Sequence, residues 1–374
     1  QAYMTYSYLS NTASLLPKPL DDENFDFYGR TLNGQPQQRE RAKRGVSTIN
    51  AVLGKAVGRL YAERHFPPEA KAQVLALVES MRRAYADRIE HLPWMSAETK
   101  VKAREKLARF TPKIGYPDTW RDYSALEVRA GDAFGNARRA STYAWNYDVA
   151  RLGRPSDRTE WLFMDPQDVN AYYNASFNEI VFAAAILQPP FFDPNADAAV
   201  NYGGIGGVIG HEMGHGFDDQ GAKSDASGVL RDWWNAQDVH NFQQRTHALV
   251  EQYSAFEALP GLHLNGQNTV GENIGDNGGL QVARVAYYMS LNGQQPPTIG
   301  GLTGDQRFFM SWAQAWRSKI RDEFLRTITA SDEHSPDRFR VNGVVRNMDA
   351  WYAAFNIQPG DALYLPPEQR VTIW

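Results

Sequence analysis

The chain has 374 residues, of which 43% are hydrophobic, 12% aromatic and 22% charged, with a formal net charge of -4 and no cysteine. This composition is typical of a globular protein and excludes a disordered chain, a collagen-like repeat and a disulfide scaffold. The small negative charge offers no broad attraction to phosphates, so we expect no nucleic-acid partner. The longest apolar run, Ile180–Leu187, is far shorter than the roughly 20 residues of a membrane span, so we expect no membrane segment.

Three helices are predicted in the first third of the chain. Apolar side chains recur at helical spacing over residues 53–61 and again over residues 74–85. A third helix is predicted after Ser96, which is a suitable N-cap residue. The helical periodicity then fades, and we expect a domain boundary near residue 128, with residues 1–128 as one domain and residues 129–374 as the other.

The middle of the chain changes period. Side chains alternate over residues 169–174, and a second short run of strand-forming residues follows at 179–182, which together predict a β-hairpin. The glycine-rich run at 203–210 lacks the Gly-x-Gly-x-x-Gly spacing and leads into a helix with two histidines, which argues against a dinucleotide-binding loop.

The strongest chemical signal is the pentamer His211-Glu212-Met213-Gly214-His215. Residues four apart lie on one face of a helix, so both imidazoles can bind one metal ion while Glu212 reaches a water molecule bound to that ion. This geometry is typical of zinc hydrolases. Gly214 inside the helix costs about 1 kcal/mol relative to Ala. We expect that it lets another backbone, that of a helix carrying Glu272, approach closely.

A zinc hydrolase needs a third protein ligand and an open position for water. One candidate is Glu272, with Asp276 four residues later on the same helix face, and the other is His263 in a turn-like segment. Spacing alone favours Glu272 and leaves His263 open. Metal-bound histidines usually donate their second N–H to a carboxylate, and Asp218 and Asp219 are both close enough in sequence to accept it.

Several blocks of sequence closely resemble the catalytic half of the neprilysin and endothelin-converting-enzyme family of zinc metallopeptidases. The main blocks, in chain order, are residues 169–173, 186–192, 201–206, 211–221 and 271–280. The resemblance reaches back to the first third of the chain. It implies a mainly α fold with a small β-hairpin, in which a thermolysin-like (gluzincin) zinc peptidase lobe follows part of a second, helical lobe.

The resemblance also implies roles for single residues. One Zn²⁺ per chain is bound by His211, His215 and Glu272, which decides against His263. The expected catalytic residues are Glu212 as general base, Asp276 as a proton donor or as the partner of a downstream histidine, and His334, that histidine, as the group that stabilises the oxyanion. Asp218 is expected to orient a zinc-bound histidine. The substrate-binding residues implied are Asn170 and Ala171 for the peptide backbone, Arg340 for a carbonyl, and Ile186, Phe191, Val208 and Trp316 for an apolar pocket.

We therefore expect a zinc-dependent endopeptidase that cleaves oligopeptides on the N-terminal side of large apolar residues. Gly207 stands where the family has a bulky pocket residue, which leaves the pocket preference open. Family members are considerably longer, so the resemblance implies that the N-terminal half of the helical lid lobe is missing. It also implies a bacterial member in the periplasm or the extracellular space. The alternatives are a zinc-binding or peptide-binding fragment without turnover, and an exopeptidase.

Overall fold

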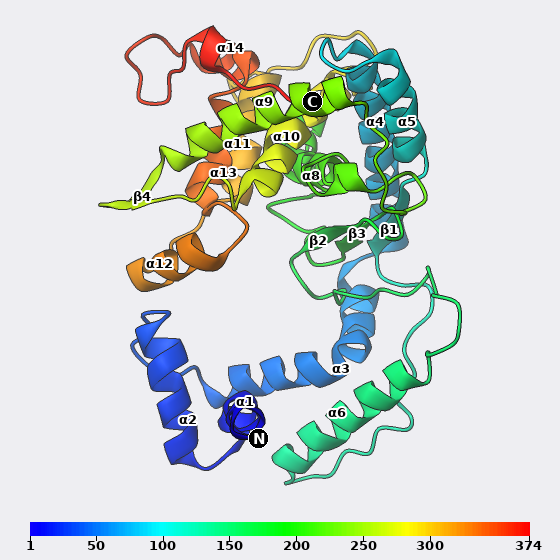
Figure 1. Ribbon diagram of the computed structural model, residues 1–374, viewed down its shortest axis with the longest axis vertical. Coiled ribbons are helices and arrows are strands. Elements are labelled where there is room, and N and C mark those ends of the chain that lie inside the picture. Colours follow the sequence, from blue (N-terminus) through cyan, green and yellow to red (C-terminus); the bar gives the residue numbers. More distant parts are fainter.

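The chain folds into a larger and a smaller part, which Figure 1 shows one above the other. The computed structural model describes residues 1–374. The helices of the smaller, lower part are α1 (Ala2–Thr12), α2 (Lys18–Asn24), α3 (Arg41–His65) and α6 (Ala133–Val149). The helices of the larger part are α4 (Pro68–His91), α5 (Ala97–Ala108), α7 (Ala198–Asn201), α8 (Gly207–Gly214), α9 (Ala236–Ser254), α10 (Val270–Ser290), α11 (Gly304–Ala315), α13 (Asp337–Val345) and α14 (Asp349–Phe355). One more helix, α12 (Asp322–Ser331), lies between the two parts. The predicted mainly helical fold is confirmed.

The helices predicted in the first third of the chain are present as α3, α4 and α5. In α4, the side chains of Val74, Val78 and Met81 are fully buried, as helical spacing of apolar residues requires. Helix α5 begins after Ser96, whose hydroxyl oxygen accepts a hydrogen bond from the backbone N–H of Thr99 at 3.3 Å. The N-cap therefore fixes the start of α5 as expected.

Helix α3 buries a different face from the apolar row that predicted it. The buried residues of α3 are Gly54, Gly58 and Ala62, whereas Leu60 is 56% exposed. A Cβ atom on Gly54 would lie only 1.6 Å from Oδ2 of Asp165. The small face is buried because the chain around Asp165 packs directly on the helix backbone, which larger side chains would prevent.

A three-stranded sheet stands beside the helices of the larger part. The predicted hairpin is confirmed as β2 (Ala171–Asn174) and β3 (Glu179–Ala183), which pair antiparallel. Strand β1 (Thr111–Gly115), which the sequence pattern did not indicate, pairs parallel with β3 on its other side. The strand order β1-β3-β2 leaves β2 at an edge with one free side. A separate short hairpin is formed by β4 (Glu257–Leu259) and β5 (Leu262–His263).

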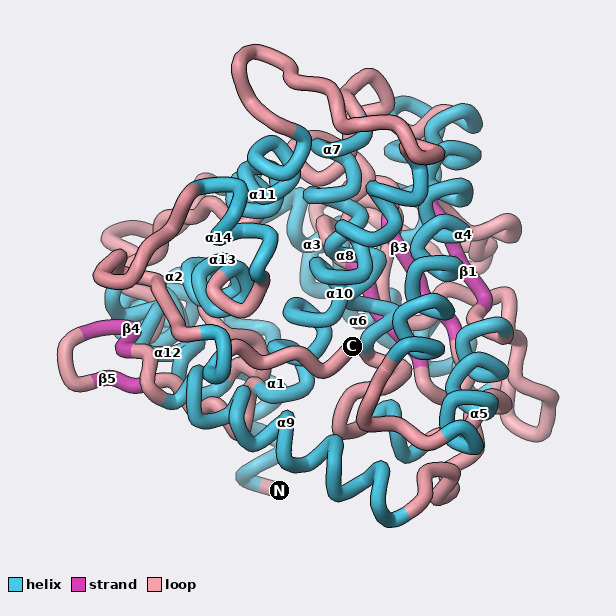
Figure 2. The backbone as a smooth tube through the Cα atoms, turned by 90° about the horizontal axis from the view of Figure 1, so that it is seen from above, coloured by secondary structure: helices cyan, strands magenta, loops and turns pink.

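Helices α8 and α10 cross in the middle of the larger part, with α4, β1 and β3 on one side and α11 and α13 on the other (Figure 2). Their backbones touch through glycines. A Cβ atom on Gly210 would lie 2.4 Å from the carbonyl oxygen of Gly279, and one on Gly214 would lie 3.2 Å from Cα of Gly275. The expected close approach of the Glu272 helix at Gly214 is therefore confirmed.

One hydrophobic core joins α4 and α5 to the C-terminal helices. Its buried side chains begin at Phe66 and end at Trp374. Elements from both sides of residue 128 contribute to this core, and the division of the chain at that residue stays a prediction. None of the helices combines the length and the apolar character needed to cross a membrane.

Candidate metal centre

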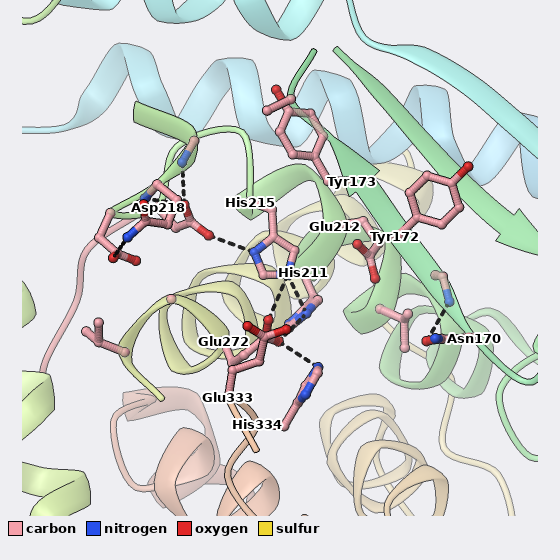
Figure 3. Close-up of a pocket in the computed structure, with 18 of the residues that line it drawn as sticks. Asn170, Tyr172, Tyr173, His211, Glu212, His215, Asp218, Glu272, Glu333 and His334 are labelled. Carbon is pink, nitrogen blue, oxygen red and sulfur yellow. Dashed lines mark hydrogen bonds and ion pairs between the residues drawn. The ribbon is translucent and has the colours of Figure 1, made fainter. Parts of the chain in front are cut away.

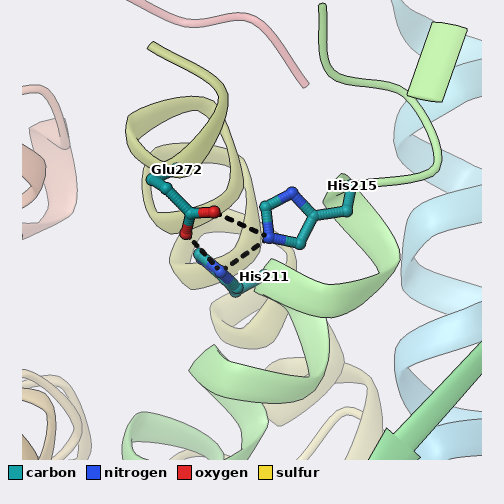
Figure 4. Close-up of side chains that lie close together, drawn as sticks. All are labelled: His211, His215 and Glu272. Atoms are coloured by element: carbon teal, nitrogen blue, oxygen red, sulfur yellow. Dashed lines mark hydrogen bonds and ion pairs between the residues drawn. The ribbon is translucent and has the colours of Figure 1, made fainter. Parts of the chain in front are cut away.

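Three side chains from two crossing helices meet at one point (Figure 4). His211 lies in the last turn of α8, His215 is the residue that ends this helix, and Glu272 lies in the first turn of α10. The Nε2 atoms of the two histidines are 3.0 Å apart. Glu272 places Oε2 at 3.1 Å from Nε2 of His211 and Oε1 at 3.5 Å from Nε2 of His215. Glycine contacts between α8 and α10 bring these three residues together.

This donor set fits a zinc ion. A tetrahedral zinc with bonds near 2.0 Å keeps its ligand atoms roughly 3.3 Å apart, which is close to the spacings found here. Burial would raise the pKa of Glu272, but hydrogen bonds from His211 and His334 hold it well below its usual value, so the ligand is a carboxylate. The alternative ligand, His263, is exposed on β5 and lies outside this cluster.

Each histidine is held from behind by a carboxylate. Nδ1 of His211 lies 2.8 Å from Oδ1 of Asp276, and Nδ1 of His215 lies 2.7 Å from Oδ2 of Asp218. These contacts direct both Nε2 atoms to the point where a metal would bind. Burial alone would lower the pKa of His211, but its carboxylate neighbours, Asp276 foremost, raise this pKa to about 10. The structure brings Asp218 to the place that the sequence indicated.

Asp276 does not contact His334, which was one of its two expected roles. Its carboxylate instead accepts two hydrogen bonds of 2.7 Å from the buried guanidinium of Arg340, besides the contact with His211. His334 has its own carboxylate: its Nδ1 lies 2.9 Å from Oδ1 of Asp332. Asp332 was missed because only its position two residues before His334 pointed to it.

His334 lies at the open side of the cluster. Its Nε2 atom is 3.1 Å from Oε2 of Glu272, and its side chain is 43% exposed. Burial would lower the pKa of His334, but Glu272 and Asp332 raise it to about 9, so the imidazole is a proton donor at neutral pH. The carboxylate of Glu333, also absent from the sequence prediction, comes close to both Glu272 and His334.

Glu212 projects toward the sheet. Figure 3 shows it between the histidines and Tyr172 of the edge strand β2. Its side chain is buried, which raises the pKa of Glu212 above its ordinary value, while the nearby histidines oppose this shift. A carboxylate with a raised pKa next to a metal site is well suited to take up a proton from water.

A cleft of about 1020 Å³ runs over the metal centre. All seven residues expected to bind substrate line it: Asn170, Ala171, Ile186, Phe191, Val208, Trp316 and Arg340. The guanidinium of Arg340 also stacks 3.8 Å from the ring centroid of Trp316. Gly207 does not line the cleft, because the ring of Trp312 occupies the space beside it, 2.7 Å from the position of a Cβ atom.

Two histidines one helical turn apart, a glutamate beside them and a carboxylate from a crossing helix are typical of zinc-dependent metallopeptidases. Two models described as peptidase family M13 match residues 170–371 and residues 1–117. The chain belongs to peptidase family M13, which confirms the resemblance that the sequence showed.

Relatives of known identity match over the whole chain. Neprilysin of Mus musculus is 35% identical over 387 residues, which cover 100% of this chain and 51% of that protein. Endothelin-converting enzyme 1 of Bos taurus is 36% identical over 383 residues, which cover 100% of this chain and 50% of that protein. The crystal structure of a zinc metalloprotease of Mycobacterium tuberculosis with an inhibitor is similar with a TM-score of 0.94 and 52% identity, over 98% of this chain and 56% of that one. The chain thus spans about half the length of these relatives.

Proposed function

We propose that this chain is a zinc-dependent endopeptidase that hydrolyses oligopeptides on the N-terminal side of large apolar residues. The observation that carries the proposal is the triangle of His211, His215 and Glu272, in which each imidazole has a carboxylate behind it and its Nε2 atom directed inward. Family membership supports zinc endopeptidase chemistry in general. The identity of the metal, the roles of the residues and the cleavage preference belong to the proposal.

The surrounding side chains can carry out amide hydrolysis. Zinc bound by the three ligands supplies Lewis acidity to the scissile carbonyl and to an attacking water molecule. Glu212 accepts a proton from that water and later delivers it to the leaving amine. His334 lies at the open side of the site with its Nδ1 atom 2.9 Å from Asp332, so its Nε2–H can donate a hydrogen bond to the carbonyl oxygen as negative charge develops on it. Asp276 holds the guanidinium of Arg340 in place through an ion pair of 2.7 Å.

The cleft supports binding of an extended peptide. Strand β2 has one free edge, and Asn170 and Ala171 at its start line the cleft, so a substrate backbone can add to the sheet as a further strand. Ile186, Phe191, Val208 and Trp316 provide an apolar pocket for one side chain. Since Trp312 fills the space beside Gly207, the glycine supports no enlargement of this pocket, and a large apolar residue stays the preferred occupant.

The smaller part, with helices α1, α2, α3 and α6, is proposed to be a portion of a helical lid lobe. Large apolar side chains are exposed on its helices: Tyr3 (81%), Met4 (74%), Tyr6 (63%) and Trp145 (69%). Such exposure is expected where a further segment of a longer protein packs. Location in the periplasm or the extracellular space is part of the same proposal and rests on the family.

The conservative substitution Glu212→Gln tests the mechanism. The variant is expected to bind one zinc per chain with nearly unchanged affinity, and to lose hydrolysis of a fluorogenic peptide by a factor of at least about 100. Zinc content by atomic absorption and the hydrolysis rate are measured on the same samples. A variant that keeps its zinc and hydrolyses at the wild-type rate contradicts the assignment of Glu212 as base.

The two alternative functions give different results in the same assay. A peptide blocked at both ends is incubated with the wild-type chain, and the cleavage sites are mapped by mass spectrometry. Internal cleavage before large apolar residues supports the endopeptidase. Stoichiometric zinc without cleavage indicates a binding fragment without turnover, and cleavage only of peptides with a free end indicates an exopeptidase.

A further inference from the structure

Lys106 is a buried cation without a carboxylate in contact. Its side chain in α5 is 1% exposed, and its ammonium donates hydrogen bonds of 2.7 Å to the backbone carbonyls of Gly221 and Ser224. Burial lowers the pKa of Lys106 to about 8, and the more distant carboxylates of Asp218 and Asp225 oppose this shift. Burying an ammonium costs several kcal/mol. The two carbonyls and the rings of Tyr173, Phe217 and Trp233, each with its centroid 5.8 Å from the ammonium, offset part of this cost.

The two carbonyls belong to the loop that follows the zinc ligand His215. In this loop, Oδ1 of Asp218 accepts the N–H groups of Gln220 at 2.9 Å and of Gly221 at 2.6 Å. The other carboxylate oxygen, Oδ2, lies 2.7 Å from Nδ1 of His215 (Figure 3). The ammonium thus holds the carbonyl of Gly221, Asp218 accepts the N–H of the same residue, and the other oxygen of Asp218 contacts the imidazole. This series of contacts ties the position of the imidazole to α5.

The backbone of Lys106 reaches the other side of the cleft. Its carbonyl oxygen accepts a hydrogen bond of 3.0 Å from the side-chain amide of Asn178. Asn178 lies in the turn between β2 and β3, where its backbone φ angle is 51°. The hydroxyl of Tyr173 on β2 donates to the same side chain at 2.9 Å. The C-terminal end of α5 therefore connects the loop behind the metal site with the hairpin that carries the edge strand.

We propose that Lys106 is a positioning residue, which anchors the loop of residues 218–224 so that Asp218 directs the His215 imidazole toward the metal. The inference rests on the proposed zinc site. Helix α5 contributes no side chain to the cleft, but in this proposal it controls the geometry of the ligand His215. Removing the ammonium frees the Gly221 residue, and the carboxylate of Asp218 then no longer has a fixed position.

The test compares Lys106→Met with Lys113→Met. Lys113 is the matched control: its side chain is only 9% exposed, and its ammonium lies 2.7 Å from Glu179 on β3, away from the loop. Zinc affinity is measured by competition with a chelator, and the ligand geometry by the visible spectrum of the Co²⁺-substituted protein. We expect Lys106→Met to weaken zinc binding about 10–100-fold and to change the Co²⁺ spectrum. Lys113→Met is expected to lose stability while zinc affinity stays within about twofold of wild type.

A double-mutant cycle shows whether Lys106 acts through Asp218. The double variant with Lys106→Met and Asp218→Asn should lose much less zinc affinity than the product of the two single fold-losses. Both substitutions break the same series of contacts. Wild-type zinc affinity in Lys106→Met, or fully multiplicative losses in the double variant, overturns the proposal. Should Lys106→Met fail to fold, Lys106→Gln gives the answer, because its side chain is polar but ends one bond short of the ammonium position and cannot hold both carbonyls: weaker zinc binding supports the proposal and wild-type binding overturns it. A wild-type chain that binds no zinc overturns the proposed function itself.

Discussion

Substitution of Gly210 by alanine tests whether the glycine contact between α8 and α10 builds the metal site. The new Cβ atom would lie 2.4 Å from the carbonyl oxygen of Gly279 and 2.7 Å from its Cα atom. Both are backbone atoms, which cannot rotate away. Ordinary contact begins near 3.4 Å, so the two helices must separate by about 1 Å. Overpacking of this kind typically costs about 1–3 kcal/mol of unfolding free energy.

The same displacement separates zinc ligands. Gly210 directly precedes His211, and Gly279 lies two helical turns after Glu272 on α10. A metal site tolerates ligand displacements of only about 0.2 Å, so Gly210→Ala should weaken zinc binding by at least about tenfold. Urea unfolding of the zinc-free chain gives the stability, and chelator competition gives the zinc affinity.

Gly45 provides the control, because it is exposed in α3 and a Cβ atom there meets nothing within 4 Å. Gly45→Ala should raise the stability by about 0.5–1 kcal/mol, since alanine restricts the unfolded chain, and leave zinc binding unchanged. If Gly210→Ala unfolds at the wild-type urea concentration and binds zinc as tightly as wild type, the close crossing of α8 and α10 does not hold the ligands in place.

Three further predictions follow from the charges at the site. Zinc affinity should rise with pH, because His211, whose pKa is raised to about 10, must lose a proton to bind zinc. Calorimetry in buffers of different ionisation enthalpy should detect the released proton. A heat of binding that does not depend on the buffer contradicts the predicted proton release. The carboxylates that raise the pKa of His211 and of His334 also stabilise the zinc-free fold, because they favour the protonated imidazoles of the folded state. This stabilisation is complete below about pH 6.5 and is lost as the pH rises through 9 and 10. A urea midpoint that stays constant over this range contradicts the prediction. Asp276→Asn leaves the buried Arg340 without its counter-charge and should cost about 3–5 kcal/mol in urea unfolding, so a loss under about 1 kcal/mol contradicts the pairing.

The parts of the site that the sequence predicted are those set by local spacing. His211 and His215 lie four residues apart, and a helix alone places them on one face. The β2–β3 hairpin follows in the same way from alternating side chains and a short turn. Spacing favoured Glu272 over His263, because His263 lies in a turn-like segment with apolar neighbours.

Features that depend on distant segments could not be predicted from spacing. Strand β1 forms because β3 offers it a parallel edge, and that partner lies far along the chain. The buried face of α3 is determined by the chain around Asp165, and the sequence of α3 alone does not indicate this contact. His334 and Arg340 were found through resemblance to a family, but their carboxylate partners, Asp332 and Asp276, depend on how α13 and its preceding loop approach α10.

The candidate ligands are held by one part of the molecule. Helices α8 and α10, which carry them, contribute buried side chains to the core that extends from Phe66 to Trp374. The smaller helical part contacts this body through the largely buried 2.9 Å ion pair of Lys55 with Asp165, and through Tyr61 of α3, which packs against the core. The arrangement of the candidate ligands is therefore set within the core, to which no buried residue of α1, α2, α3 or α6 belongs.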